Sequence, residues 1–267
     1  MRSFRGRLAA CLALLAVLLS ACSERSSVPS TSSTSTSTST TVAPSSTTTS
    51  APTTTSTSTT TTTLPVITPF LELGSSGARV LALQRRLSAL GYWLGPDDGV
   101  FGDSTQQAVY AIQKAAGIER DGIVGPETDA ALNKGVVPVP RPAVGHVIEI
   151  DLNDDLLMFV DNGKLMWTLN TSTGGGYTYE GSSGPAVALT PVGIFYTYRV
   201  IDGLDIDPLG ELWRPRFFTD GFAIHGDSYV PPEPVSHGCV RVSNEAIDWI
   251  WAENLDPIGM EVWVYGS

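Results

Sequence analysis

Hydrophobic residues recur along the chain with two different periods, and the change of period divides the folded part in two. Apolar residues three or four positions apart predict one face of a helix, formed by Val80, Leu83, Leu87 and Leu90. Gly91 is expected to end this helix. From Val147 to Leu152 the period is two, as in a strand with one buried face. The pattern therefore predicts a helical part followed by a β part.

A repeat within the helical part predicts two further helices. Residues 98–105 read DGVFGDST and residues 121–128 read DGIVGPET, so each copy places a glycine-bearing turn before a helix start. Pro126 suits the first helical position, and the acidic residues after it favour the positive end of the helix dipole. The buried face of the middle helix is expected to contain Ala108, Ile112 and Ala115. These signals predict a small all-α three-helix domain, which we assign to residues 67–135.

The β part begins after a Pro-rich spacer at residues 136–142 and extends over residues 143–267. Asn162-Gly163 between two apolar runs predicts a hairpin. Further strands are predicted at residues 193–200 (GIFYTYRV) and 260–265 (MEVWVY).

One helix is predicted in the β part, from about residue 244 to 253, with Ser243 as its N-cap. Short strands, turn signals and a single helix together favour a mainly β domain, either a β-sandwich or a barrel. Residues 201–221 contain Trp213 and several acidic residues but no pattern that we can interpret.

The N-terminus has the composition of a targeting segment. Arginines precede the apolar run LAACLALLAVLL, which is short for a membrane span and ends in small residues, so residues 1–21 are predicted to be a signal peptide. Leu19-Ser20-Ala21-Cys22 resembles the lipobox of bacterial lipoproteins, which implies that Cys22 is lipidated. Ordinary secretion with cleavage near Ala21 is the alternative. Residues 22–66, rich in Ser and Thr, are predicted to be a disordered linker.

The chain is strongly acidic, with a formal net charge of −11. Removing residues 1–21 takes away three arginines and no acidic residue, so the charge of the remainder becomes −14. A chain of this charge is a poor ligand for nucleic acid or for anionic lipid surfaces. We therefore expect no nucleic-acid partner.

The candidate chemistry lies between residues 222 and 244, which contain two of the three histidines and Cys239. With Cys11 removed and Cys22 lipidated, Cys239 has no partner, which in a secreted protein suggests either intermolecular pairing or a reactive thiol. His225 precedes a Pro-rich loop that can return the chain to Cys239, and an imidazole nearby can generate the thiolate. Gly238 permits close backbone approach, and N–H groups around it can form an oxyanion hole.

Two other interpretations of this stretch remain open at this point. The first is a zinc site, because four residues are competent ligands, although the chain has no HExxH sequence: His225, Asp227, His237 and Cys239. The second is an inert cysteine buried among structural histidines. So many polar residues and glycines in a short span make a poor core, which disfavours the second interpretation.

The stretch Ser236-His237-Gly238-Cys239-Val240-Arg241, with His225-Gly226 upstream, resembles the conserved motif of the L,D-transpeptidases with a YkuD-type catalytic domain. Residues 171–175 (TSTGG) and 190–195 (TPVGIF) add to this resemblance. The gap of ten residues between His225 and Ser236 is shorter than in some members. The helical part, through LALQRRLSALGY and its two repeats, resembles the peptidoglycan-binding domain of many cell-wall hydrolases.

The resemblance implies a role for each matching residue. Cys239 is expected to be the nucleophile, and His225 the general base and acid, with its tautomer fixed by the Gly226 carbonyl. His237 is expected to border the substrate pocket, and its N–H with those of Gly238 and Cys239 to line the oxyanion hole. Ser236 is expected to hydrogen-bond near the reacting carbonyl. Arg241 is expected to pair either with a substrate carboxylate or with an acidic residue of the protein.

The implied function is a cysteine-dependent transpeptidase of cell-wall biogenesis that forms 3→3 crosslinks through a thioester on tetrapeptide stems, and that carbapenem-type β-lactams inactivate. An L,D-carboxypeptidase and a non-catalytic wall-anchoring lipoprotein are the alternatives. The chain has no Ser-x-x-Lys, which argues against a penicillin-binding serine mechanism. No cofactor is implied. The expected partners are stem peptides and glycan of peptidoglycan, and the expected location is the outer face of the bacterial membrane, held by the lipid on Cys22.

Overall fold

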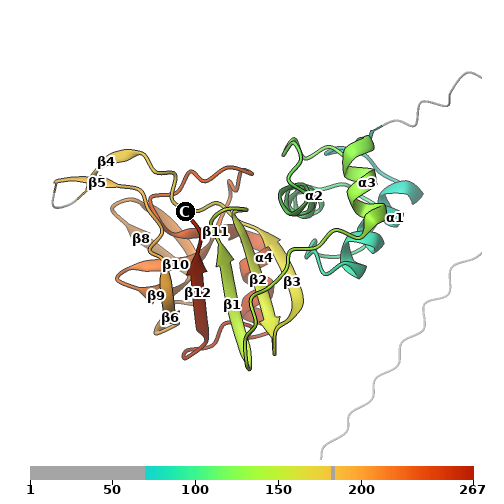
Figure 1. The fold of residues 1–267 in the computed structure, drawn as a ribbon. Helices are drawn as coiled ribbons and strands as arrows, with labels where there is room; N and C mark the ends of the chain where they lie inside the picture. Colours follow the sequence, from blue (N-terminus) through green and yellow to red (C-terminus); the bar gives the residue numbers. More distant parts are fainter. Residues whose placement is uncertain (1–69, 182–183) are drawn as a thin grey trace, which may run out of the picture. The chain divides into compact units, whose positions relative to one another are not determined.

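The computed structural model describes residues 70–181 and 184–267 (Figure 1). The predicted signal peptide, the lipidation site at Cys22 and the linker lie outside these residues. Among the helices of the described residues, none is both long and apolar enough to cross a membrane. The fold combines three helices with a mainly β part, which confirms the predicted fold class.

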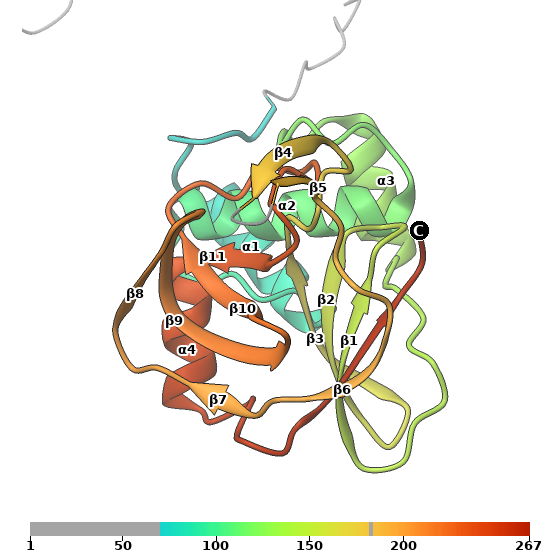
Figure 2. The ribbon, with the colours of Figure 1, turned by 90° about the vertical axis from the view of Figure 1, so that its left-hand side faces the viewer.

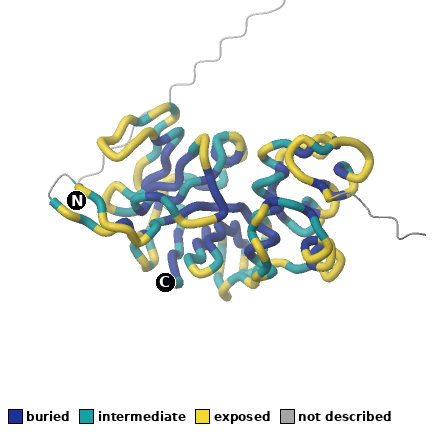
Figure 3. The backbone as a smooth tube through the Cα atoms, turned by 90° about the horizontal axis from the view of Figure 1, so that it is seen from above, coloured by how far each residue is buried: buried dark blue, intermediate teal, exposed yellow. Residues whose placement is uncertain are grey.

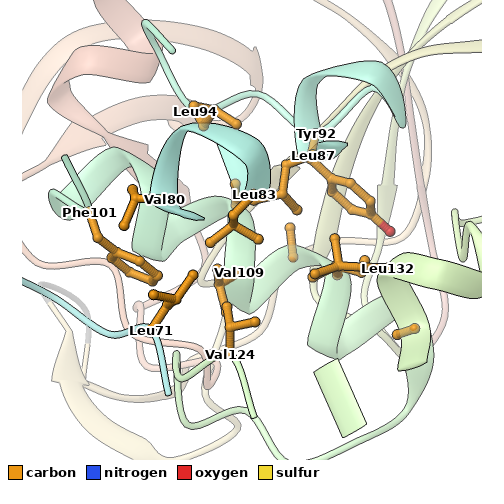
Figure 4. Close-up of a cluster of buried hydrophobic side chains, with 14 of the residues drawn as sticks. Leu71, Val80, Leu83, Leu87, Tyr92, Leu94, Phe101, Val109, Val124 and Leu132 are labelled. Atoms are coloured by element: carbon orange, nitrogen blue, oxygen red, sulfur yellow. The ribbon is translucent and has the colours of Figure 1, made fainter. Parts of the chain in front are cut away.

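The three helices of the helical module (residues 70–135) are α1 (Ala78–Ala89), α2 (Asp103–Ala116) and α3 (Pro126–Lys134). As predicted, Pro126 opens the third helix, and the apolar face of α1 is buried while Leu90 is partly buried. Side chains from the three helices meet those of the intervening turns in one core, which includes Leu71, Leu83, Phe101, Val109, Ile112, Val124 and Leu132 (Figure 4). Ala108 is buried in this core as predicted, whereas Ala115 is only partly buried.

A buried glutamine stabilises each repeat turn. Gln84 Nε2 lies 2.9 Å from Asp98 Oδ1 and 3.1 Å from Thr105 Oγ1, and its Oε1 accepts the Gly99 N–H at 2.7 Å. Because Gln84 is almost fully buried, these bonds satisfy polar groups that would otherwise lose their water.

The second copy has the same arrangement. Gln113 Nε2 lies 2.7 Å from Asp121 Oδ1 and 3.1 Å from Thr128 Oγ1, and its Oε1 accepts the Gly122 N–H at 2.9 Å. The sequence repeat is thus a repeat of hydrogen bonds, although each glutamine lies outside the repeated octapeptide.

The β domain (residues 143–267) is built from two sheets and a short ribbon in the described part of the chain. One sheet has the order β3-β2-β1-β12-β6, the other β11-β10-β9-β7 with β8 paired to β9, and β4-β5 form the ribbon (Figures 1 and 2). The strands are β1 (His146–Asp151), β2 (Leu156–Asp161), β3 (Lys164–Asn170), β4 (Thr178–Gly181), β5 (Gly184–Val187), β6 (Gly193–Tyr196), β7 (Arg199–Val200), β8 (Leu204–Asp207), β9 (Gly210–Thr219), β10 (Phe222–Asp227), β11 (Val240–Ser243) and β12 (Glu261–Tyr265).

Side chains from both sheets and from α4 (Asn244–Ala252) form the core of the β domain. The helix packs against β9, β10 and β11 (Figure 2). Coloured by burial, the chain has its buried residues inside this domain and its exposed residues mostly at turns and along the ribbon (Figure 3). Core residues from β1, β2, β10, β11 and α4 include Ile148, Ile150, Leu157, Ile224, Val240, Val242, Ile247 and Ile250.

Two local signals of the β part are confirmed. Asp161 pairs with Lys164 across a two-residue turn, in which Asn162 and Gly163 both have positive φ, as the hairpin prediction requires. Ser243 caps α4, because its hydroxyl accepts the Ala246 N–H at 3.2 Å.

Two other predictions need correction. Residues 193–200 form two strands rather than one: β6 pairs with β12, and β7 pairs with β9 in the other sheet. The change of partner occurs at Thr197, whose hydroxyl donates to the buried Asp256 at 2.5 Å. The alternation predicted for β1 also fails at Glu149, which is fully buried. Its carboxylate tolerates burial because it accepts bonds from the Arg141 N–H and the Tyr265 hydroxyl.

Helix α2 of the helical module packs against β2 and β3. Asn170 Nδ2 donates to Gln107 Oε1 at 2.6 Å, and the Gln107 amide donates to the Val230 carbonyl at 3.0 Å. The neighbouring turn adds a bridge between Tyr92 and Thr168. The helical module is therefore joined to the β domain by buried and partly buried hydrogen bonds as well as by apolar contact.

Candidate active site

The parallel pair β10–β11 brings the two ends of the candidate motif together. In this pair Ile224 lies opposite Val240 and His225 lies opposite Arg241. Cys239 immediately precedes β11. Because side chains alternate along a strand, Val240 enters the core while Cys239 and Arg241 face the other side. His225, Cys239 and Arg241 line one cavity of about 290 Å³.

Cys239 is a free, partly exposed thiol at the wall of this cavity. Its Sγ lies 4.0 Å from the Gly221 carbonyl oxygen. Burial raises the pKa of Cys239 to about 11, although the Ala223 N–H favours the thiolate and opposes that shift. The residue is therefore a thiol at neutral pH, and a base must remove its proton before it can act as a nucleophile.

His225 has the tautomer that such a base needs. Its Nδ1 lies 2.9 Å from the Gly226 carbonyl oxygen. Because a carbonyl oxygen only accepts, Nδ1 carries the proton and Nε2 keeps its lone pair. Burial lowers the pKa of His225 below its ordinary value, so the ring is neutral at neutral pH. The expected role of the Gly226 carbonyl is thus met in the geometry.

Ser236 stabilises the turn before Cys239. Its hydroxyl donates to the Cys239 carbonyl at 2.6 Å and accepts the Gly238 N–H at 2.9 Å. The hydroxyl and the Gly238 N–H are therefore both engaged inside the turn. This differs from the expectation that Ser236 bonds near the reacting carbonyl and that Gly238 N–H lines the oxyanion hole.

Gly238 itself is required by the backbone. Its φ is 138°, and a Cβ at this position would overlap the Phe222 ring and lie 2.7 Å from the Leu189 carbonyl oxygen. Its own carbonyl accepts the Thr190 hydroxyl at 2.8 Å, and that hydroxyl in turn accepts the Gly174 N–H at 2.9 Å.

The segment 171–175 runs alongside the Cys239 turn and pairs with it. Ser236 N–H donates to the Thr173 carbonyl at 2.9 Å, and Gly175 N–H donates to the Ser236 carbonyl at 3.1 Å. Ser172 and Arg241 exchange two backbone bonds, at 3.0 and 3.1 Å. The two segments that the sequence connected only through a family resemblance thus form the scaffold of the site.

His237 lies at the border of the cavity, as expected, and contacts two aromatic rings. Its ring centroid is 4.6 Å from that of Tyr179 and 5.6 Å from that of Tyr177. Tyr179 belongs to β4 of the ribbon and lines the cavity, and the Tyr177 hydroxyl donates to the Val235 carbonyl at 3.2 Å. The ribbon therefore forms one wall beside the thiol.

Arg241 pairs with an acidic residue of the protein. Its Nε lies 3.2 Å from Asp227 Oδ2, and both side chains are about one fifth exposed. Of the two alternatives for this guanidinium, the internal ion pair is the one present in the structure. Arg241 also lines the cavity.

In the described part of the chain, no three or more His, Cys, Asp or Glu side chains come together in an arrangement that could bind a metal ion. Of the four ligands considered for zinc, Asp227 is paired with Arg241, and His225 directs Nδ1 to a carbonyl.

The sequence did not reveal two walls of the cavity. One is Tyr179, for which the only signal is an alternation of two tyrosines with polar residues at 177–180. The other is the β8–β9 hairpin in residues 201–221, which contributes Asp207 and residues 209–212. No pattern in that segment indicated contact with the site.

Comparison with known proteins agrees with this geometry. Residues 145–258 match the model described as L,D-transpeptidase catalytic domain, and residues 76–132 match the one described as putative peptidoglycan binding domain. The chain is similar to the crystal structure of the L,D-transpeptidase (residues 123–326) from Xylanimonas cellulosilytica DSM 15894. The two share 47% identity at a TM-score of 0.73, over 76% of this chain and all of that one.

Curated relatives match over a shorter stretch. Two Bacillus licheniformis proteins are similar, a probable N-acetylmuramoyl-L-alanine amidase at 49% identity over 65 residues and the N-acetylmuramoyl-L-alanine amidase CwlL at 52% over 64 residues. The matches cover 24% and 23% of this chain and 18% of each amidase, so the chain spans less than a fifth of these relatives.

Proposed function

The chain belongs to the L,D-transpeptidase family, and from that premise we propose that it forms 3→3 crosslinks in peptidoglycan through a thioester on Cys239. The donor is a tetrapeptide stem, whose amide between the L-centre of diaminopimelate and the terminal D-Ala is broken. The acceptor is an amine of a neighbouring stem. The observation that supports this proposal best is one cavity lined by both Cys239 and a His225 whose Nδ1 faces the Gly226 carbonyl, so that Nε2 keeps its lone pair.

In the first step, His225 Nε2 takes the proton of Cys239 as Sγ forms a bond to the stem carbonyl. The carbonyl π electrons move to its oxygen. When they return, the C–N bond breaks, and His225 gives its proton to the departing nitrogen of D-Ala. The products are free D-Ala and a thioester on Cys239.

In the second step, the acceptor amine attacks the thioester carbonyl, and His225 takes a proton from the attacking nitrogen. Collapse of the tetrahedral intermediate breaks the C–S bond. Sγ leaves as a thiolate and regains its proton from His225. The enzyme returns to its neutral thiol and neutral imidazole, which are the states that burial favours.

The oxyanion of both intermediates needs hydrogen-bond donors. Gly238 N–H is engaged by Ser236, so we assign this role to the N–H groups of His237 and Cys239. We assign to Ser236 the task of orienting the Cys239 peptide. We assign to Arg241, which pairs with Asp227 and lines the cavity, the binding of a stem carboxylate.

The test is incubation of the chain with a disaccharide-tetrapeptide, with mass spectrometry of the products and of the protein. We expect a dimer with a 3→3 bond, free D-Ala, and an acyl group on Cys239. Cys239→Ala should abolish all three, and Cys239→Ser serves as the matched variant that keeps the shape of the side chain. Tripeptide without any dimer would support the carboxypeptidase instead. Turnover that survives in Cys239→Ala would refute the thioester mechanism.

We also propose that the helical module binds the wall and that Cys22 tethers the protein to the outer face of the bacterial membrane. The match of residues 76–132 to a peptidoglycan-binding model supports the first part, and the Leu19–Cys22 sequence supports the second. Deletion of residues 71–134 should remove cosedimentation with purified wall. Metabolic labelling with an alkyne fatty acid should be lost in Cys22→Ala, and equal labelling of that variant would contradict the anchor.

A further inference from the structure

Lys114 is a fully buried lysine on α2. Its Nζ donates to the carbonyl oxygens of Asp155 at 2.9 Å and of Thr171 at 2.8 Å, and it lies 3.4 Å from Asp155 Oδ2. All of these acceptors belong to the β domain, although the lysine belongs to the helical module. A buried ammonium is costly unless it is paired and hydrogen-bonded, so these contacts are what allows it to be there.

The contacts of Lys114 continue to the nucleophile through one series of buried hydrogen bonds. Asp155 Oδ1 accepts the Thr173 hydroxyl at 2.7 Å and the Thr173 N–H at 3.1 Å. The Thr173 carbonyl accepts the Ser236 N–H at 2.9 Å. The Ser236 hydroxyl then donates to the Cys239 carbonyl at 2.6 Å. Lys114, Asp155, Thr173 and Ser236 are each at most 2% exposed.

Thr171 provides a second connection. Its carbonyl accepts a hydrogen bond from Lys114, and its hydroxyl donates to the Arg241 carbonyl at 2.7 Å. Arg241 is the second residue after Cys239 and lines the same cavity. Lys114 thus supports both threonines of the scaffold. It bonds directly to Thr171, and it reaches Thr173 through Asp155.

The helical module also contacts the loop that enters the Cys239 turn. Gln107 donates to the Val230 carbonyl at 3.0 Å, and Arg120 donates to the Pro232 carbonyl at 3.3 Å. Both carbonyls lie between His225 and Ser236. The helical module therefore supports the middle of this loop, at Val230 and Pro232, and through Lys114 and the 171–173 segment it supports the end of the loop at Ser236.

We infer that Lys114 is a positioning residue for Cys239, acting through Asp155, Thr173 and Ser236, and that the helical module completes the active site besides binding the wall. The inference rests on the proposed function for the reaction that it affects. A lysine at this place orders the 171–173 backbone on which the Cys239 turn is built. Misplacement of reacting groups by about 1 Å can lower a rate about a hundredfold.

The experiment uses Lys114→Met in the full chain, with Lys134→Met as the matched control, because Lys134 is exposed on α3 of the same module. With the soluble disaccharide-tetrapeptide, wall anchoring does not affect the measurement. We expect kcat of Lys114→Met to fall about tenfold to hundredfold with little change in KM, while Lys134→Met matches the wild type. Unchanged kcat in a folded Lys114→Met, or an equal loss in the control, would overturn the inference.

A second variant separates positioning from stability. Lys114→Met leaves the Asp155 carboxylate buried without its cation, and Lys114→Met/Asp155→Asn removes that charge while Oδ1 can still accept from Thr173. We expect the double variant to recover melting temperature and circular dichroism but not kcat. Recovery of both would mean that the lysine serves stability alone, and the inference would fail.

A third readout does not depend on transpeptidation. The rate of Cys239 alkylation by iodoacetamide at pH 7.5, divided by the rate at pH 11, reports how well the protein assists ionisation of the thiol. We expect this ratio to fall about tenfold in Lys114→Met, corresponding to the same loss of assistance as in kcat. A wild type without turnover would refute the proposed function, yet the ratio would still support or refute the role of Lys114.

Discussion

The repeat turns of the helical module and the turn that contains Cys239 are hydrogen-bonded by groups from different parts of the chain. Each is a glycine-bearing turn whose backbone is bonded by buried polar side chains. In the repeat turns the side chain is Gln84 or Gln113, from a helix of the same module. In the Cys239 turn the bonds come from the turn's own Ser236 side chain, from the Thr190 hydroxyl and from the backbone carbonyl of Thr173. Thr173 is connected in turn to Lys114 through Asp155. The repeat turns are thus bonded within one module, whereas the turn that contains the proposed nucleophile is bonded in part by segments far along the chain.

The largest expected difference between the two kinds of turn is at their glycines. Gly238→Ala would place Cβ against the Phe222 ring and 2.7 Å from the Leu189 carbonyl, so the Cys239 turn must shift. We expect kcat/KM to fall more than about a hundredfold. In Gly99→Ala the new Cβ lies 3.5 Å from its nearest neighbour and only the positive φ is strained, which lowers the unfolding free energy by about 1–2 kcal/mol.

Measurement of kcat/KM and of urea unfolding for both variants tests this contrast. A Gly99→Ala enzyme that lost activity while folded would remove the distinction between the two turns.

The next contrast concerns the polar side chains. Ser236→Ala removes the bonds to the Cys239 carbonyl and the Gly238 N–H, and we expect kcat to fall about tenfold. Gln113→Ala leaves buried partners unsatisfied in a repeat turn, which should lower the unfolding free energy by about 1–3 kcal/mol with kcat unchanged. Ser236→Ala should therefore lower turnover more than the melting temperature, and Gln113→Ala should lower the melting temperature without lowering turnover. Equal loss of stability in the two would contradict the comparison.

A smaller effect is expected at the threonines. Thr190→Val removes the donor to the Gly238 carbonyl while keeping the shape of the side chain, and kcat should fall about threefold. Thr105→Val makes the matched change in the first repeat turn, where it should lower the unfolding free energy by about 1 kcal/mol. Steady-state kinetics and chemical unfolding of both variants will show whether Thr190 affects only kcat and Thr105 only the unfolding free energy.

The smallest effect is the dependence on pH. His225 must be neutral to act as a base, and burial places its pKa below the ordinary 6.5. The rate of Cys239 acylation by a carbapenem should therefore lose less than half its value between pH 7.5 and 6.5, and fall only at lower pH. In the first repeat turn, the Gln84 amide lowers the pKa of Asp98, so that carboxylate stays charged over this range.

Acylation followed by mass spectrometry from pH 8 to 5 measures the His225 titration. In His225→Gln, alkylation of the thiol should instead rise with a midpoint at about pH 11. An acylation midpoint at or above pH 6.5 would show that His225 is not in the buried, neutral state described above.

The same contrast explains which elements could be predicted from the sequence. The Asn162-Gly163 hairpin, the Ser243 cap and the helix start at Pro126 depend on residues within a few positions, and all are confirmed. The two-sheet division of residues 193–200 depends on Asp256 and on strands far along the chain, so the local pattern predicted one strand. The sequence pattern predicted that Glu149 faces solvent, because the partner that satisfies its carboxylate in the core, Tyr265, is distant in sequence.

For the site, residue types and spacing favoured Cys239 and His225 as a nucleophile and its base, and the resemblance to the L,D-transpeptidases implied the same roles. The structure places both residues at one cavity. The roles of Ser236 and Gly238 N–H were not predictable, because their bonds run inside the turn and depend on its conformation. Tyr179 and Lys114 were missed for a related reason. Each reaches the site from an element whose position is set by tertiary packing.

Adjacent residues of α2 face different parts of the molecule. Gln113 bonds to the second repeat turn, and Lys114 bonds to Asp155 in the β domain. A chimaera in which another three-helix wall-binding unit replaced this one would therefore keep its own fold yet fail to match the β domain, unless it carried a lysine at the equivalent place. In this chain, the helical module and the β domain are therefore exchangeable only if the residues that join them, such as Lys114 and Asp155, are exchanged as well.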